Sequence, residues 1–72
     1  MNGGQAMKRV VYSRYQAGEL VVLKKDCGKY MKGHRFVVDD PRKTGSDRKI
    51  KVHDPMTNVS AMFPSKYLSD IK

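Results

Sequence analysis

Short apolar segments, separated by turn-forming residues, run from Gly18 to Ile71 of this 72-residue chain. The clearest is 49–53, where Ile50 and Val52 point to one side and the residues between them to the other. Segments this short, each with one apolar face, suit strands that enclose a single thin core. The pattern predicts one small all-β domain, because so short a chain has no room for a second core.

Five strands are expected, and turn chemistry separates them. They cover residues 19–24, 34–39, 49–53, 59–63 and 68–71, with a long loop at 25–33. Asp40-Pro41 should end the second strand, since proline has no N–H to donate to a neighbouring strand. Pro55 and Asn58 predict a turn in which Asn58 suits a left-handed conformation. Residues 64–67 suit a single 3₁₀ turn before the closing strand.

Residues 1–17 are expected to form a flexible or partly ordered N-terminal arm, ahead of a barrel at 18–72. Two structures compete for Met7–Tyr15. Apolar residues fall near helical spacing, and Gly18 sits where a helix would end. Val10-Val11-Tyr12 is β-branched and aromatic, which favours a strand or an extended segment. We therefore expect either a short helix or an extra strand, with the strand preferred.

The order of strands, long loop and 3₁₀ turn is that of a five-stranded SH3-like small barrel. Residues 63–68, Phe-Pro-Ser-Lys-Tyr-Leu, resemble the run that closes eukaryotic signalling SH3 domains. That resemblance implies that Pro64 and Tyr67 line a groove for proline-rich peptides. The chain contains no tryptophan, however, and such grooves depend on aromatic ridges. The resemblance therefore bears more on the barrel than on a proline-rich ligand.

A second resemblance concerns the first strand and the long loop. The run 18–23, with Gly28-Lys29 and Lys32-Gly33 after it, resembles the KOW-type barrels of ribosomal and transcription-elongation proteins. In that family the loop after the first strand touches RNA or a polymerase partner. The resemblance implies the same role for residues 25–33.

The charge of the chain favours a polyanionic partner. Fifteen lysines and arginines stand against seven acidic residues, which gives a formal net charge of +8. Cationic side chains set against phosphates release counterions, and aromatic rings among them can stack on exposed bases. The candidate binding residues lie around the long loop, on one face of the 49–53 strand, and near both: Lys24, Lys25, Lys29, Tyr30, Lys32, His34, Arg35, Arg42, Lys43, Arg48, Lys49, Lys51, His53 and Tyr67.

The predicted function is non-catalytic binding of DNA or RNA, mainly by electrostatics, through the long loop and one strand face. The alternative is a small adaptor or regulator, such as a phage- or plasmid-borne modulator, that docks on a host enzyme or on the transcription or translation machinery. An apolar patch of Tyr30, Met31, Met62 and Tyr67 would carry that contact. The oligomeric state is left open, since exposed strand edges can pair.

Other functional classes lack a signal in the sequence. No nucleophile–base pair and no nucleotide-binding fingerprint occurs, so an enzyme is not expected. Cys27 is the single cysteine, and neither His34 nor His53 has further ligands at metal-binding spacing, so no cofactor or metal is expected. No apolar run approaches the roughly 18 residues of a membrane span, and a cytoplasmic location is expected.

Overall fold

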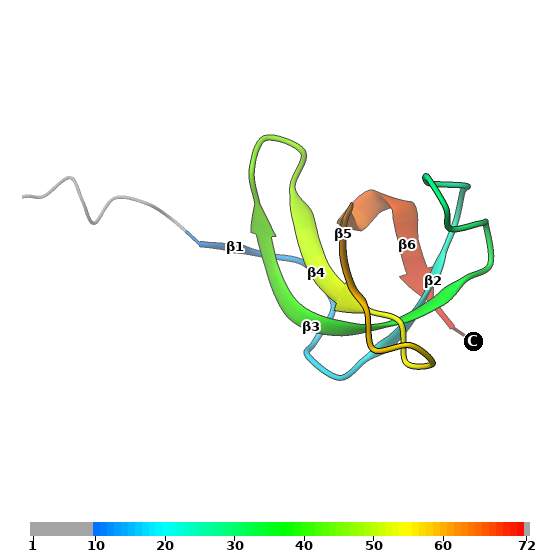
Figure 1. The fold of residues 1–72 in the computed structure, drawn as a ribbon. Helices are drawn as coiled ribbons and strands as arrows, with labels where there is room; N and C mark the ends of the chain where they lie inside the picture. Colours follow the sequence, from blue (N-terminus) through cyan, green and yellow to red (C-terminus); the bar gives the residue numbers. More distant parts are fainter. Residues whose placement is uncertain (1–9, 72) are drawn as a thin grey trace, which may run out of the picture.

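A computed structural model describes residues 10–71, and within that range the chain is all-β with no α-helix. The elements are β1 (Val11–Tyr12), β2 (Leu20–Leu23), β3 (Arg35–Thr44), β4 (Lys49–His53), β5 (Ser60–Pro64), the 3₁₀ turn η2 (Ser65–Tyr67) and β6 (Leu68–Asp70) (Figure 1). Of the two structures expected near the N-terminus, the extra strand is present as β1. Residues 1–9 of the expected arm lie outside the described residues, and residues 10–17 are described.

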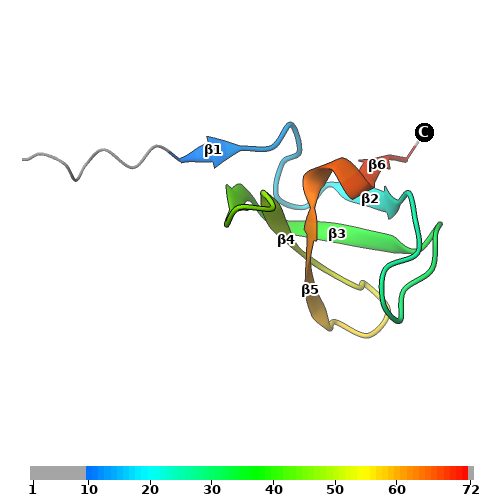
Figure 2. The same ribbon diagram turned by 90° about the horizontal axis from the view of Figure 1, so that it is seen from above.

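The strands form one antiparallel sheet in the order β5-β4-β3-β2-β6. The ten-residue strand β3 is strongly curved (Figure 1). It pairs with β2 near its start, while its far end pairs with β1 through Val11↔Lys43 and Tyr12↔Arg42 (Figure 2). Within the described residues the outer strands β5 and β6 do not pair, so the sheet stays open. The expected closed barrel is therefore corrected to an open sheet, and the five expected strands together with the extra strand β1 make six.

The expectation that Asp40-Pro41 ends the second strand is wrong, because β3 continues to Thr44. The pairing of β3 with β4 shifts register on both sides of Asp40, so the strand is irregular there. Pro41 cannot donate a hydrogen bond, but its carbonyl accepts one from the Ser13 N–H at 2.8 Å. An irregular stretch leaves some ladder positions unpaired, and proline is tolerated at such positions.

The buried core follows the predicted alternation of apolar residues along the strands. Ile50 and Val52 are fully buried while Lys51 between them is exposed. The core consists of Tyr15, Val21, Leu23, Phe36, Val38, Ile50, Val52, Phe63 and Leu68. Tyr15 joins it from the segment before β2, and its hydroxyl donates to the Leu68 carbonyl at 2.9 Å. Burial raises the pKa of Tyr15.

Two local predictions are confirmed. Asn58 adopts the left-handed conformation, with φ of +63°, in the turn between β4 and β5. Residues 65–67 form the single 3₁₀ turn before the closing strand. Among residues 10–71, no helix has the length and apolar character to cross a membrane.

Candidate functional site

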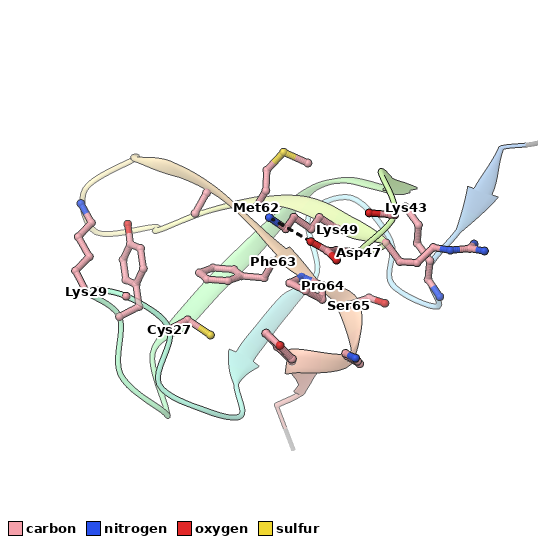
Figure 3. A pocket seen from close by; sticks show the side chains of 16 residues that line it. Cys27, Lys29, Lys43, Asp47, Lys49, Met62, Phe63, Pro64 and Ser65 are labelled. Atoms are coloured by element: carbon pink, nitrogen blue, oxygen red, sulfur yellow. Dashed lines mark ion pairs between the residues drawn. The ribbon is translucent and has the colours of Figure 1, made fainter.

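A groove of about 800 Å³ opens between the loop at 24–34 and the β3–β4 hairpin. One wall comes from residues 27–30, the other from residues 46–49 with Lys43, and the floor from residues 61–67 of β5 and η2. Figure 3 shows Cys27 and Lys29 on one side, Lys43 and Asp47 on the other, and Phe63 and Pro64 between them. We call this groove the basic groove.

The lining of the basic groove is strongly cationic. Asp47 is its single carboxylate, and it lies 3.9 Å from the ammonium group of Lys49. The five cations of the lining are Lys29, Lys43, Arg48, Lys49 and Lys66. Apart from Lys49, none of these five cations has a carboxylate of residues 10–71 within ion-pair distance. Unneutralised cations that converge on a concave surface concentrate positive potential there, which attracts polyanions.

Two tyrosine rings in the basic groove each carry a lysine above them. The Nζ atom of Lys25 lies 4.5 Å from the ring centre of Tyr67, and that of Lys66 lies 5.9 Å from it. The Nζ atom of Lys29 lies 5.4 Å from the ring centre of Tyr30. Such cation–π contacts are weak at exposed positions, so a ligand can displace them.

The loop that carries Lys29 and Tyr30 is fixed to the body of the sheet. The Tyr30 ring packs edge-on against Phe36 and Phe63, at centroid distances of 5.1 and 5.9 Å. The backbones of Cys27 and Tyr30 exchange hydrogen bonds of 2.8 and 2.9 Å. These contacts hold Lys29 and Tyr30 at the wall of the groove.

The β3–β4 hairpin presents Arg48 in a strained backbone conformation. Its φ of +56° lies in the left-handed region, which costs a residue with a side chain roughly 1–2 kcal/mol. The Arg48 N–H donates to the Gly45 carbonyl at 3.2 Å, and the Arg48 carbonyl accepts from the Ser65 N–H at 3.2 Å. These bonds tie the hairpin to η2 and hold the strained turn. Strain of this kind is found at functional sites.

A smaller hollow of about 280 Å³ adjoins the basic groove. The two share Lys43, Ser65 and Lys66, and the hollow adds Arg14 and Lys24 with no carboxylate in its lining. The Arg14 guanidinium donates to the Tyr15 hydroxyl at 3.1 Å and to Asp70 at 2.9 Å. Tyr15 raises the pKa of Arg14 most, and Asp70 raises it further. Cationic surface is therefore continuous from one hollow to the other.

The structure brings part of the predicted site together. Six of the predicted residues line the basic groove: Lys29, Tyr30, Lys43, Arg48, Lys49 and Tyr67. Lys24 lines the smaller hollow, and Lys25 covers the ring of Tyr67. The long loop and the start of the hairpin thus meet across one groove.

Other predicted residues lie elsewhere. Lys32, Arg35 and Lys51 are exposed and line neither hollow. The guanidinium of Arg42 binds both carboxylate oxygens of Asp40, at distances from 2.6 to 3.1 Å. Hydrogen bonds from Arg42 lower the pKa of Asp40 to about 2. The charge of Arg42 is thus already matched within the fold.

Both histidines face aspartates. The Nε2 atom of His34 lies 2.8 Å from Asp54, and the Nδ1 atom of His53 lies 2.6 Å from Asp39. Asp54 is buried, and hydrogen bonds from the Met56 N–H and from His34 lower its pKa. The first pair joins the loop before β3 to the turn after β4, and the second joins β4 to β3. Neither pair lines the basic groove. Within residues 10–71, His, Cys, Asp and Glu side chains form no group of three that could hold a metal ion.

Sequence reasoning missed two cations of the site, Lys66 and Arg14. Lys66 stands beside Tyr67 in the predicted 3₁₀ turn, so the turn itself was a signal that could have found it. Nothing near Arg14 in the sequence indicates that it reaches the smaller hollow. Its position depends on the pairing of β1 with the end of β3.

Comparison with known proteins gives no relative for this chain, since no family model, no curated protein and no solved structure matches it.

Proposed function

We propose that this chain is a small non-catalytic nucleic-acid-binding domain whose basic groove contacts the phosphate backbone of DNA or RNA. The observation that carries the proposal is the lining of the groove, with five cations and one carboxylate. Each lysine or arginine set against a phosphate releases condensed counterions, which drives binding with little dependence on base sequence. Tyr30 and Tyr67 add aromatic surface among the cations.

We assign the scaffold to the SH3-like class of small β folds. Three features support the assignment: the sheet order β5-β4-β3-β2-β6, the long loop between β2 and β3, and the 3₁₀ turn between β5 and β6. The KOW-type resemblance of residues 18–33 agrees with a binding role for the loop wall of the groove. In this scaffold the cations of the basic groove come from the long loop, from the β3–β4 hairpin and from η2, while the sheet provides a rigid base.

The test is fluorescence anisotropy with a labelled oligonucleotide at low and at physiological salt. Affinity should fall steeply as salt rises, and the double variant Lys43→Glu/Lys66→Glu should abolish most of the binding. The matched control is Lys32→Glu/Arg35→Glu, which changes the net charge equally at exposed positions outside both hollows. Absence of binding at low salt, or an equal loss in both variants, would contradict the proposal.

A protein partner is the second candidate, and the apolar part of the same groove favours it. Pro64 and Tyr67 both line the groove, and Met62 beside them is 46% exposed. An apolar contact of this kind would survive moderate salt. A partner retained from nuclease-treated lysate, released by Met62→Lys but kept by Lys43→Glu, would favour this function over nucleic-acid binding.

A further inference from the structure

We infer that the basic groove takes single-stranded nucleic acid in preference to duplex, with bases stacked on Tyr30 and Tyr67. The inference rests on the proposed nucleic-acid function and narrows its substrate class. It follows from the position of the aromatic rings, from the lysines above them, and from the smaller hollow that continues the cationic surface.

The rings lie among the residues that line a concave surface. Tyr30 stands in one wall and Tyr67 at the end of the floor, and both are half-buried. In a duplex the faces of the bases are stacked on one another and cannot meet a side-chain ring. In a single strand each base can leave its neighbour and stack on an aromatic residue. Tyrosines inside a groove therefore suit a single strand better than a duplex.

The contacts of the two rings match the chemistry of a nucleotide. Each ring has an ammonium group above it, from Lys29 over Tyr30 and from Lys25 and Lys66 near Tyr67. A nucleotide carries both a base, which can replace the ammonium on the ring, and a phosphate, which can receive the displaced ammonium. One ligand thus satisfies the ring and the lysine together. A polyanion without bases would satisfy the lysine alone.

The smaller hollow extends the cationic surface along which a nucleic-acid strand can lie. Lys43, Ser65 and Lys66 belong to both hollows, and Lys24 extends the cationic lining past them. An extended strand with one phosphate per nucleotide can meet cations along this whole path. A single phosphate or a mononucleotide would use only part of it.

A tryptophan reporter tests the inference directly. The chain has no tryptophan, so in Tyr67→Trp the emission comes from the groove alone. We expect an oligothymidylate to quench this emission, and inorganic polyphosphate to bind without quenching it. Polyphosphate supplies the charges but no base, so the comparison separates stacking from electrostatics.

Affinity measurements give a second, independent reading. Tyr67→Leu keeps the apolar bulk and removes the ring. It should lower the affinity for oligothymidylate about tenfold and leave the affinity for a duplex of equal length unchanged. Tyr12→Leu is the control, because Tyr12 is 62% exposed and lines neither hollow. If Tyr67→Leu does not fold, the Tyr67→Trp emission decides alone.

The outcomes separate this inference from the function on which it rests. Binding of oligothymidylate without quenching in Tyr67→Trp would overturn the inference and leave nucleic-acid binding intact. Equal affinity for duplex and single strand would also overturn the inference and leave nucleic-acid binding intact. If neither binds at low salt, the proposed function fails as well.

Discussion

The Nε2 atom of His34 lies 2.8 Å from Oδ2 of Asp54, which joins the loop at 24–34 to the turn after β4. The Asp54 carboxyl is almost fully buried, and its other oxygen accepts the Met56 N–H at 2.8 Å. His34 also packs against Tyr30, with ring centres 4.9 Å apart. The aspartate therefore supports, through His34, the wall of the basic groove that carries Tyr30.

Removal of the buried carboxylate should destabilise the fold. Asp54→Ala leaves both the Met56 N–H and His34 without their acceptor, so the free energy of unfolding should fall by about 2 kcal/mol. Urea unfolding measures the change. Asp47→Ala is the control, because the exposed Asp47–Lys49 pair at 3.9 Å should contribute under about 0.5 kcal/mol. Equal effects of the two substitutions would show that the His34–Asp54 contact is not structural.

Stability should decline in acid below about pH 4. The pKa values of Asp40 and Asp54 are lowered from 3.8 in the fold, that of Asp40 to about 2. The unfolded chain therefore binds more protons in this range, and stability present above pH 4 is lost as pH falls toward the folded pKa values. Urea midpoints between pH 6 and pH 2 measure this loss. Asp54→Asn should reduce the dependence on pH, and an unchanged profile would contradict the assignment.

Stability and binding should respond in opposite directions at Arg48. Glycine adopts a φ of +56° without strain, so Arg48→Gly should raise the free energy of unfolding by up to about 1 kcal/mol. Loss of the guanidinium should weaken nucleic-acid binding. Arg48→Ala removes the same charge but keeps the strain, so it should weaken binding equally with no gain in stability. Thermal unfolding and anisotropy on the same samples measure both quantities.

The segment before β2 should contribute to the stability of the fold. Tyr15→Phe removes the hydroxyl that donates to the Leu68 carbonyl, and should cost about 1 kcal/mol. Tyr12→Phe is the matched control, since Tyr12 is exposed and its change should stay within about 0.5 kcal/mol. Urea unfolding of both variants gives the comparison. A loss no larger at Tyr15 than at Tyr12 would show that the hydrogen bond from Tyr15 to Leu68 does not stabilise the fold.

The alternation of apolar residues predicts most of the strands and of the core. Ile50 and Val52 are buried as their spacing indicates, and the 3₁₀ turn falls at the expected residues. The end of β3 was mispredicted because proline is excluded from regular ladders but tolerated where the register shifts. Such a shift depends on the partner strand β4, which the local sequence does not reveal.

The candidate site is predictable only in part. Net charge and the basic loop indicate a polyanion, and they identify Lys29 and Tyr30. They do not separate Lys49, which lines the basic groove, from Lys51, which is exposed outside it. Lys66 and Arg14 became part of the site only because η2 and the pairing of β1 bring them beside Lys43.

The sequence by itself determined the all-β class, the apolar faces of the strands and the excess of positive charge, because these depend on residue type and on spacing along the chain. The tertiary structure decided that the sheet stays open, that Tyr15 enters the core, and that His34 and His53 meet aspartates. It also decided which cations converge on one groove. These features depend on contacts between residues far apart in the chain, and local sequence patterns do not predict such contacts.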